Sequence, residues 1–323
     1  MWSGRWSLAD LTVRVGELAL RNPVMPASGC FAIEYAEALD LRQLGALVIK
    51  SVSPKTRAGN PTPRVAETTS GMLNSIGIPS KGLQHFREQV LPPYTRFGTP
   101  VVVSISADTA DEFAAAVAEM TLPDVAAIEA NISCPNLEAD GMAFAMTPET
   151  TYKVVSAIRR RTSHPVWAKL TPNASSIAAV AKAAEEAGAD ALVMGNTVLG
   201  MSIDVRTRKP KLGNVMGGLS GPAIKPIALR MVHQCYRSVR IPVIGCGGIG
   251  SAEDAMEFML AGASAVQVGT ASFLDPGVMR KIVDGLHDLC AQQGVTQVRD
   301  LTGQVKLDRQ LSDRWLRFAQ QSG

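Results

Sequence analysis

The sequence predicts an α/β fold arranged as a (β/α)8 barrel. Eight short, continuously apolar segments alternate along the chain with longer amphipathic stretches. Strands that are apolar throughout are typical of a parallel sheet covered on both faces, and eight of them fit an eightfold barrel. The expected strands are Val24–Ala27, Ala46–Ser51, Pro100–Ile105, Ala126–Asn131, Val166–Leu170, Ala191–Gly195, Ile241–Gly245 and Ala265–Gly269.

Helices are expected between these strands, and the residues at their ends support them. Thr109 and the Thr147-Pro148 pair are helix-start signals. Gly188 and Gly262 stand where helices should end, and each is followed by an alanine and then by a strand. The expected helices are Thr109–Met120, Pro148–Arg161, Ser175–Ala187, Ile224–Arg237 and Ala252–Leu260.

The two ends of the chain add smaller pieces. Residues Leu11–Leu20, which turn at Gly16-Glu17, predict a β-hairpin that caps the barrel floor. No domain boundary is visible, so residues 1–323 are expected to form one domain. Residues 303–323 form a polar tail of unassigned role, in which Asp313–Gln321 has a helical pattern.

Composition excludes several classes of protein. Hydrophobic residues make up 46% of the chain and charged residues 19%, as in an ordinary globular enzyme. The net charge of +3 comes without a basic tract, so no nucleic-acid partner is expected. No segment is apolar for long enough to span a bilayer, and the N-terminus does not have the pattern of a signal peptide. Five scattered cysteines favour reduced thiols and a cytoplasmic location over disulfides or a zinc site.

Polar residues and glycines at the expected strand ends predict a functional site, because barrel chemistry lies at the C-terminal ends of the strands. Lys50 and Lys169 are either rim lysines that reach solvent or cations that face an anionic ligand in the mouth. The polar residues at the neighbouring strand ends favour the second interpretation, in which both lysines face an anionic ligand. The strand-end residues are Ser28, Lys50, Ser51, Ser104, Asn131, Lys169, Asn196, Thr197, Gly247, Gly248, Gly269 and Thr270.

A glycine-rich stretch over residues 245–250 matches G-x-G-x-x-G. It follows the seventh expected strand rather than the first, and no acidic residue stands about 20 positions further on at a strand end. We therefore expect the loops after the seventh and eighth strands, at Gly247-Gly248 and Gly269-Thr270, to bind the phosphate of a mononucleotide. We do not expect a Rossmann fold that binds a dinucleotide. Residues 217–222 are expected to form a flexible turn near the same phosphate. Glycines that only make tight turns are the alternative.

The segment from Asn131 to Asn136 carries two amides, a hydroxyl and a thiol directly after an apolar strand. Pro135 disfavours helix at Cys134, so the thiol is expected on an irregular turn. It can move a proton there, while the amides orient a planar polar ring. A small buried cysteine without reactivity is the alternative.

Together these residues resemble the class 1 dihydroorotate dehydrogenase family, and most closely the catalytic subunit of its B-type. The resemblance covers nearly the whole chain up to about Thr302. Such enzymes hold FMN in a (β/α)8 barrel and oxidise dihydroorotate to orotate in pyrimidine synthesis. The motifs that carry the resemblance are Pro26–Cys30, Gly59–Glu67, Ser70–Gly77, Asn131–Asn136 and Gly217–Pro226.

The resemblance implies roles for individual residues. Cys134 would be the base that removes the C5 proton of dihydroorotate while the C6 hydride passes to the flavin, and Leu137–Gly141 would be a mobile lid. At Ser104 the family usually has an asparagine that contacts the flavin. The implied substrate-binding residues are Lys50, Asn74, Ile76, Gly77, Ile78, Asn131, Asn136, Asn196 and Thr197. The implied FMN-binding residues are Ala27, Ser28, Lys50, Ser51, Ser104, Asn131, Lys169, Gly195, Gly221, Gly247, Gly248, Gly269 and Thr270.

The resemblance also implies partners. Electrons would leave through a separate subunit that carries FAD and an iron–sulfur cluster, with NAD as final acceptor, and the catalytic chain would form a homodimer. Neither a nucleic acid nor a membrane is expected as a partner. Four alternatives stay open: a dihydropyrimidine dehydrogenase-like enzyme, a dihydrouridine synthase, a non-catalytic flavin-binding barrel, and an A-type enzyme that uses fumarate.

Overall fold

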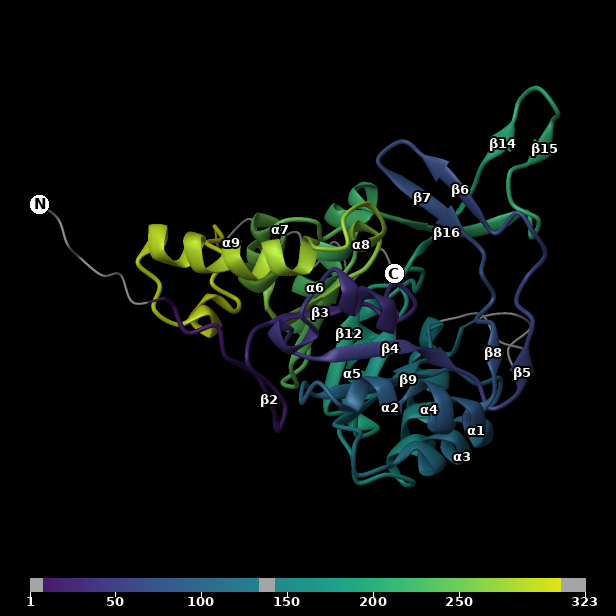
Figure 1. The fold of residues 1–323 in the computed structure, drawn as a ribbon, viewed down its shortest axis with the longest axis horizontal. Coiled ribbons are helices and arrows are strands. Elements are labelled where there is room, and N and C mark those ends of the chain that lie inside the picture. The colour runs from purple at the N-terminus through teal and green to yellow at the C-terminus, as the bar shows by residue number, and fades with distance from the viewer. Residues whose placement is uncertain (1–7, 134–142, 309–323) are drawn as a thin grey trace, which may run out of the picture.

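The computed structural model describes residues 8–133 and 143–308. Its centre is a parallel eight-stranded sheet in the order β3-β18-β17-β12-β11-β10-β9-β4. Figure 1 labels β3, β12, β4 and β9 of this sheet. The Gly45 amide donates to the Val24 carbonyl at 2.9 Å and links the two end strands into a ring. Each strand overlaps one expected from the sequence, which confirms the predicted barrel. The strands are β3 (Val24–Pro26), β4 (Leu47–Val52), β9 (Val101–Ile105), β10 (Ala127–Asn131), β11 (Val166–Leu170), β12 (Ala191–Met194), β17 (Val243–Cys246) and β18 (Ala263–Val268).

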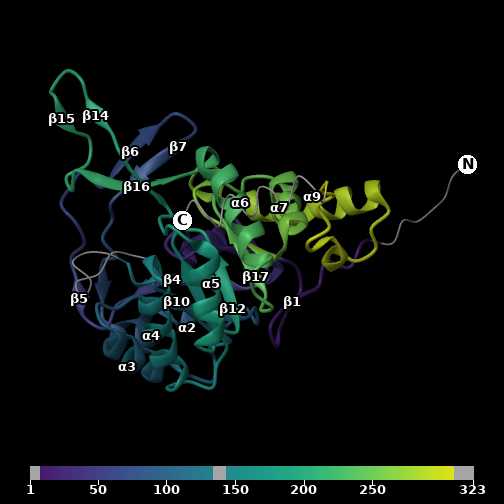
Figure 2. The same ribbon diagram turned by 180° about the vertical axis from the view of Figure 1, so that it is seen from behind.

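Helices surround the barrel, and their sequence signals work as expected. The Thr109 and Thr147 hydroxyls accept from amides of the following first turns, and Ser251 forms a capping box with Asp254. Figure 2 shows α5 and β17 from behind. The helices are α1 (Leu83–His85), α2 (Pro92–Thr95), α3 (Ala110–Met120), α4 (Pro148–Arg159), α5 (Ile177–Glu186), α6 (Lys225–Tyr236), α7 (Ala252–Ala261), α8 (Ala271–Leu274) and α9 (Val278–Gln293).

The predicted N-terminal hairpin is confirmed as β1 (Val13–Val15) and β2 (Leu18–Leu20), which pair antiparallel. A Cβ added to Gly16 in its turn would lie 3.5 Å from the carbonyl oxygen of Asp190, the residue before β12. The hairpin therefore covers the end of the barrel where the strands begin. At the other end of the chain, the Gly303 amide donates to Met259 in α7, while the expected helix at Asp313–Gln321 lies outside the described residues.

A second, antiparallel sheet stands at the end of the barrel where the strands finish, and the sequence did not predict it. Its order is β13-β16-β7-β6. Two long excursions build it, one between β4 and β9 and the other between β12 and β17. Its strands are β6 (Val65–Thr68), β7 (Gly71–Asn74), β13 (Val198–Met201) and β16 (Met216–Ser220). The prediction of a flexible turn over residues 217–222 was wrong, because residues 216–220 form a strand that pairs with β13 and β7.

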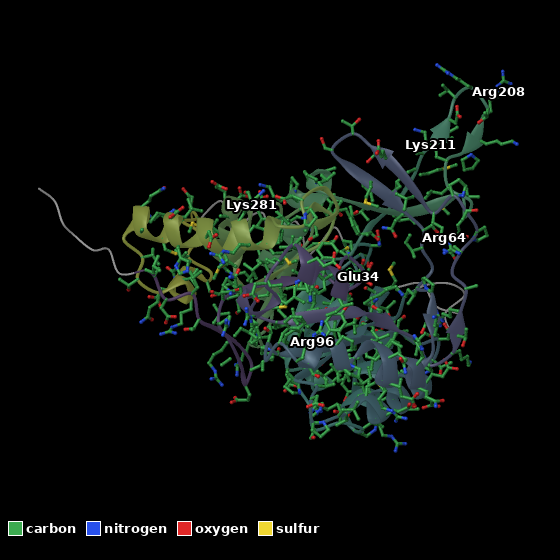
Figure 3. The ribbon with its side chains drawn as sticks, in the orientation of Figure 1. Glu34, Arg64, Arg96, Arg208, Lys211 and Lys281 are labelled. Carbon is green, nitrogen blue, oxygen red and sulfur yellow. The ribbon has the colours of Figure 1, made fainter. Side chains whose placement is uncertain are left out.

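Two short strand pairs extend the same excursions. The hairpin of β14 and β15 projects away from the barrel in both views, and Figure 3 places Arg208 and Lys211 on it (Figures 1 and 2). The pairs are β14 (Ile203–Asp204) with β15 (Lys209–Pro210), and β5 (Thr56–Arg57) with β8 (Ser80–Lys81). Across the described part of the chain, we find no helix with the length and apolarity needed to cross a membrane.

Candidate functional site

Side chains from four strand ends form one chain of hydrogen bonds in the barrel mouth. The Asn196 amide donates to the Ser133 hydroxyl at 2.5 Å, and Ser133 donates to Asn131 at 2.7 Å. The Asn131 amide in turn donates to Ser51 at 3.0 Å, and the Ser51 hydroxyl lies 2.8 Å from that of Ser104. Asn131, Ser51 and Ser104 are buried. Because each amide is tied to a neighbour, the mouth holds a fixed set of donors and acceptors for a planar polar ring.

The chain of hydrogen bonds ends deeper in the barrel on Glu129. Ser104, which is fully buried, donates to a Glu129 carboxylate oxygen at 2.9 Å. The other carboxylate oxygen accepts from the Gln267 amide at 2.7 Å. Gln267 also accepts from the Lys169 ammonium at 3.0 Å, and Lys169 donates to Ser28 at 3.2 Å. Lys169 is therefore not a rim lysine: its side chain is 4% exposed and lies 3.6 Å from Glu129.

The second sheet brings Asn74 to the same mouth. Asn74 ends β7, and its side-chain amide donates to the Gly218 carbonyl of β16 at 3.4 Å. A Cβ added to Gly218 would lie 1.9 Å from the Thr197 hydroxyl, so Thr197 packs directly on this strand. The Thr197 amide donates to the Asn196 side chain at 2.8 Å. Asn74, Thr197 and Gly218, which are far apart in the sequence, thus lie next to one another at the mouth.

Lys50 and the turn after β7 form the next part of the mouth. The Lys50 ammonium donates to the Pro79 carbonyl, and partial burial lowers the pKa of this lysine. Gly77 and Ile78 both have positive φ, at +77° and +47°, and the Ile76 carbonyl accepts from the Asn60 amide. A positive φ is strained for a β-branched residue such as Ile78, and strain of this kind gathers at ligand sites.

Glycines and small residues line the opposite side of the mouth. Gly248 lies against Lys225, because an added Cβ would be 2.8 Å from the Lys225 amide nitrogen, and Thr270 donates to Ser220 at 2.8 Å. The amides of Gly250 and Ser251 at the start of α7 already donate to Asp254. The N-terminus of the helix that follows the G-x-G-x-x-G stretch is thus capped by its own side chain. The remaining residues predicted on this side are Ala27, Gly195, Gly221, Gly247 and Gly269, which stand at or next to the ends of β3, β12, β16, β17 and β18.

Cys134 and Asn136, the proposed base and one proposed substrate ligand, lie outside the described residues, as does the expected lid at Leu137–Gly141. The other cysteines are poor bases. Burial raises the pKa of Cys30 and of Cys235 to about 12, and it also raises the pKa values of Cys246 and Cys290. A thiol with a raised pKa carries little thiolate at neutral pH.

Sequence analysis missed three residues of the site: Glu129, Ser133 and Gln267. Glu129 and Gln267 lie inside strands that were expected to be apolar, and both are fully buried. A charged or amide residue in a buried strand has to have partners, because an unpaired buried polar group is costly. That signal was present in the sequence. The partners could not be named from it, since they lie on other strands.

A barrel with paired amides, a buried ammonium and glycine loops at its mouth defines a class of proteins that bind a small polar ring beside an anionic group. The sequence matches the family model named Dihydroorotate dehydrogenase over residues 10–290, and the chain belongs to this family. The predicted resemblance is confirmed.

The chain is also similar to curated relatives, each named the catalytic subunit of dihydroorotate dehydrogenase B (NAD(+)). It is 48% identical to the protein of Geotalea uraniireducens over 297 residues, which is 91% of this chain and 97% of that protein. It is 48% identical to the protein of Geobacter sulfurreducens over 301 residues, 92% of this chain and 99% of that protein. The protein of Parabacteroides distasonis is 47% identical over 307 residues, 94% and 100% of the two chains.

Members of this family depend on FMN, and the residues of the mouth fit that group. FMN combines a planar ring with polar edges and a phosphate. The Lys169 ammonium, which donates to Ser28, and the Ser51 hydroxyl, which accepts from Asn131, would offer polar contacts to the ring. Gly247 and Gly248 have φ of +131° and +75°, which glycine adopts readily, and Cβ atoms added to them would lie 2.8 Å from Ala228 and Lys225. The chemistry of the ammonium and hydroxyl donors suits the polar edge of a planar ring, and the loop at Gly247 and Gly248 stays the predicted place of the phosphate.

Proposed function

We propose that this chain oxidises (S)-dihydroorotate to orotate in de novo pyrimidine synthesis, with FMN as its cofactor and Cys134 as its base. The observation that carries the proposal is the linked set of Asn131, Ser133 and Asn196 in the mouth of a barrel of this family. Amides held in this way match the alternating donors and acceptors on the edge of a pyrimidine. A cytoplasmic location is part of the proposal.

The reaction removes a proton and a hydride from adjacent carbons of the substrate. FMN, when bound, would supply the acceptor for the hydride that leaves C6. The chain's own residues then have two tasks: Cys134 takes the C5 proton, and the amides hold the ring so that both carbons are correctly placed. We assign Asn74, Asn136 and Thr197 to the ring and its carboxylate, with Lys50 and the backbone of Gly77 and Ile78 beside the carboxylate.

We further propose that electrons leave through a partner subunit that carries FAD and an iron–sulfur cluster, with NAD as final acceptor. The word "subunit" in the names of the relatives supports a partner protein, and the NAD in those names supports the acceptor. A homodimer of the catalytic chain completes the proposed assembly.

The proposal predicts the cofactor and the acceptor. The purified chain should be yellow and should release FMN, identified by its fluorescence and mass, when it is denatured. Isolated, it should reduce neither fumarate nor NAD well with dihydroorotate as donor, and NAD reduction should appear when the partner subunit is added. Rapid reduction of fumarate by the isolated chain would instead indicate an A-type enzyme. Absence of any flavin would contradict the proposal.

A further inference from the structure

The buried polar cluster below the mouth joins opposite sides of the barrel. β10, which carries Glu129, and β18, which carries Gln267, stand four places apart in the ring of eight strands. Their side chains nevertheless meet at 2.7 Å. Lys169 of β11 likewise reaches Ser28, which follows β3, four places away. Two side-chain contacts thus cross the barrel and fix one ammonium between its walls.

The amide of Gln267 has one orientation in this cluster. Its oxygen accepts from Lys169, and its nitrogen donates to Glu129. Neither role can be exchanged, because an ammonium only donates and a carboxylate only accepts. Gln267 therefore connects the cation to the anion through a charge-assisted hydrogen bond at each end.

Glu129 is also the end point of the hydrogen bonds from the amides. The hydrogen bonds run in one direction, from Asn131 to Ser51 and from Ser104 to Glu129. A fully buried carboxylate is costly unless it is paired and hydrogen-bonded, and both conditions are met here. Glu129 lies below the mouth and contacts the residues that line it.

We propose that Glu129, with Gln267 as its relay, is a positioning residue that keeps the Lys169 ammonium charged and fixed at the floor of the mouth. The inference rests on the proposed function, in which Lys169 lies at the edge of the FMN ring. A cation held there stabilises the negative charge of the reduced cofactor. Glu129 touches neither cofactor nor substrate, and it acts through Lys169.

Two thiols of the described residues interact electrostatically with Lys169, and neither can replace Glu129. Cys246 on β17 and Cys30 after β3 both interact electrostatically with Lys169. Burial raises the pKa of Cys246 and raises that of Cys30 to about 12, so both thiols are neutral near pH 7. Without the Glu129 carboxylate, the buried ammonium would have no full negative charge beside it from these groups and would lose its proton more readily.

The test measures the reduction potential of the bound FMN, which needs neither dihydroorotate nor turnover. Lys169→Met sets the reference, and it should lower the potential and weaken FMN binding about tenfold. Gln267→Met changes no charge, and we expect its FMN reduction potential to lie between those of the wild type and Lys169→Met. Glu129→Gln removes the charge: its amide oxygen can still accept from Gln267, while its amide nitrogen donates to Ser104, whose hydroxyl then turns to donate to Ser51. Its potential should fall more steeply with rising pH than that of the wild type, because the unpaired ammonium loses its proton more readily.

A control separates this role from simple loss of stability. Thr99, just before β9, has a buried hydroxyl that donates to the Leu41 carbonyl, and Thr99→Val removes it. The FMN reduction potential of this variant should equal that of the wild type. Wild-type potentials in Gln267→Met and Glu129→Gln at every pH, with a shifted Lys169→Met, would overturn the inference. An unshifted Lys169→Met would refute the placement of Lys169 at the flavin. A wild-type chain without FMN would refute the proposed function itself.

Discussion

Replacing Cys134 by serine should slow reduction of the bound flavin by dihydroorotate about 10²- to 10⁴-fold, the usual contribution of a positioned general base. A serine hydroxyl keeps the size of the side chain but is a far weaker acid than a thiol, so its reactive anion is scarcely populated. In the wild type the rate should rise with pH, because the thiolate is the form that accepts the proton. Anaerobic stopped-flow absorbance of the flavin measures this half-reaction directly.

Cys235→Ala provides the matched control for this variant. Cys235 is fully buried in α6, and burial raises its pKa to about 12. The control should lose some stability, because it truncates a buried side chain, but each bound flavin should be reduced at the wild-type rate. Equal rates for Cys134→Ser and wild type would show that another group takes the proton and would favour a barrel that binds flavin without this chemistry.

Gly195→Ala should be among the most damaging single changes in the chain. Gly195 follows β12 with φ of +129°, and an added Cβ would lie 1.7 Å from the Cys246 carbonyl oxygen at the end of β17. Neither backbone can move without separating two neighbouring barrel strands at the mouth. We expect a loss of more than about 4 kcal/mol in the free energy of unfolding, or failure to fold. Urea unfolding followed by circular dichroism measures this loss.

Gly98→Ala separates the clash from the backbone strain. Gly98 also has a positive φ, +66°, but an added Cβ would meet nothing within 4 Å. It should cost about 1–2 kcal/mol, the penalty of a left-handed conformation alone. A Gly195→Ala variant as stable as Gly98→Ala would show that β12 and β17 do not approach as closely as described.

The barrel could be predicted from the sequence because its signals are local. Each strand is a short apolar run, and start signals such as Thr109 and Thr147 lie directly beside their helices. The second sheet could not be predicted in the same way. β7 pairs with β16, whose residues lie 144 to 148 positions later in the chain, and β16 contains two adjacent glycines with little intrinsic preference for a strand. Only the folded barrel brings these excursions together.

The site was predictable where function follows from position in the fold. Ser51, Asn131 and Asn196 were expected at strand ends, and the structure links them in one chain of hydrogen bonds through Ser133. Glu129 and Gln267 were missed because their roles depend on contacts across the barrel, which no local pattern encodes. Ser104 stays a predicted flavin contact, and its fully buried hydroxyl is bonded to Ser51 and Glu129.

An anaerobic titration of the flavin-loaded chain with dihydroorotate tests the central claim most directly. The account predicts that the flavin absorbance bleaches and that one orotate is formed for each FMN reduced, without any partner subunit present. A flavin that stays oxidised in the presence of excess dihydroorotate would contradict it.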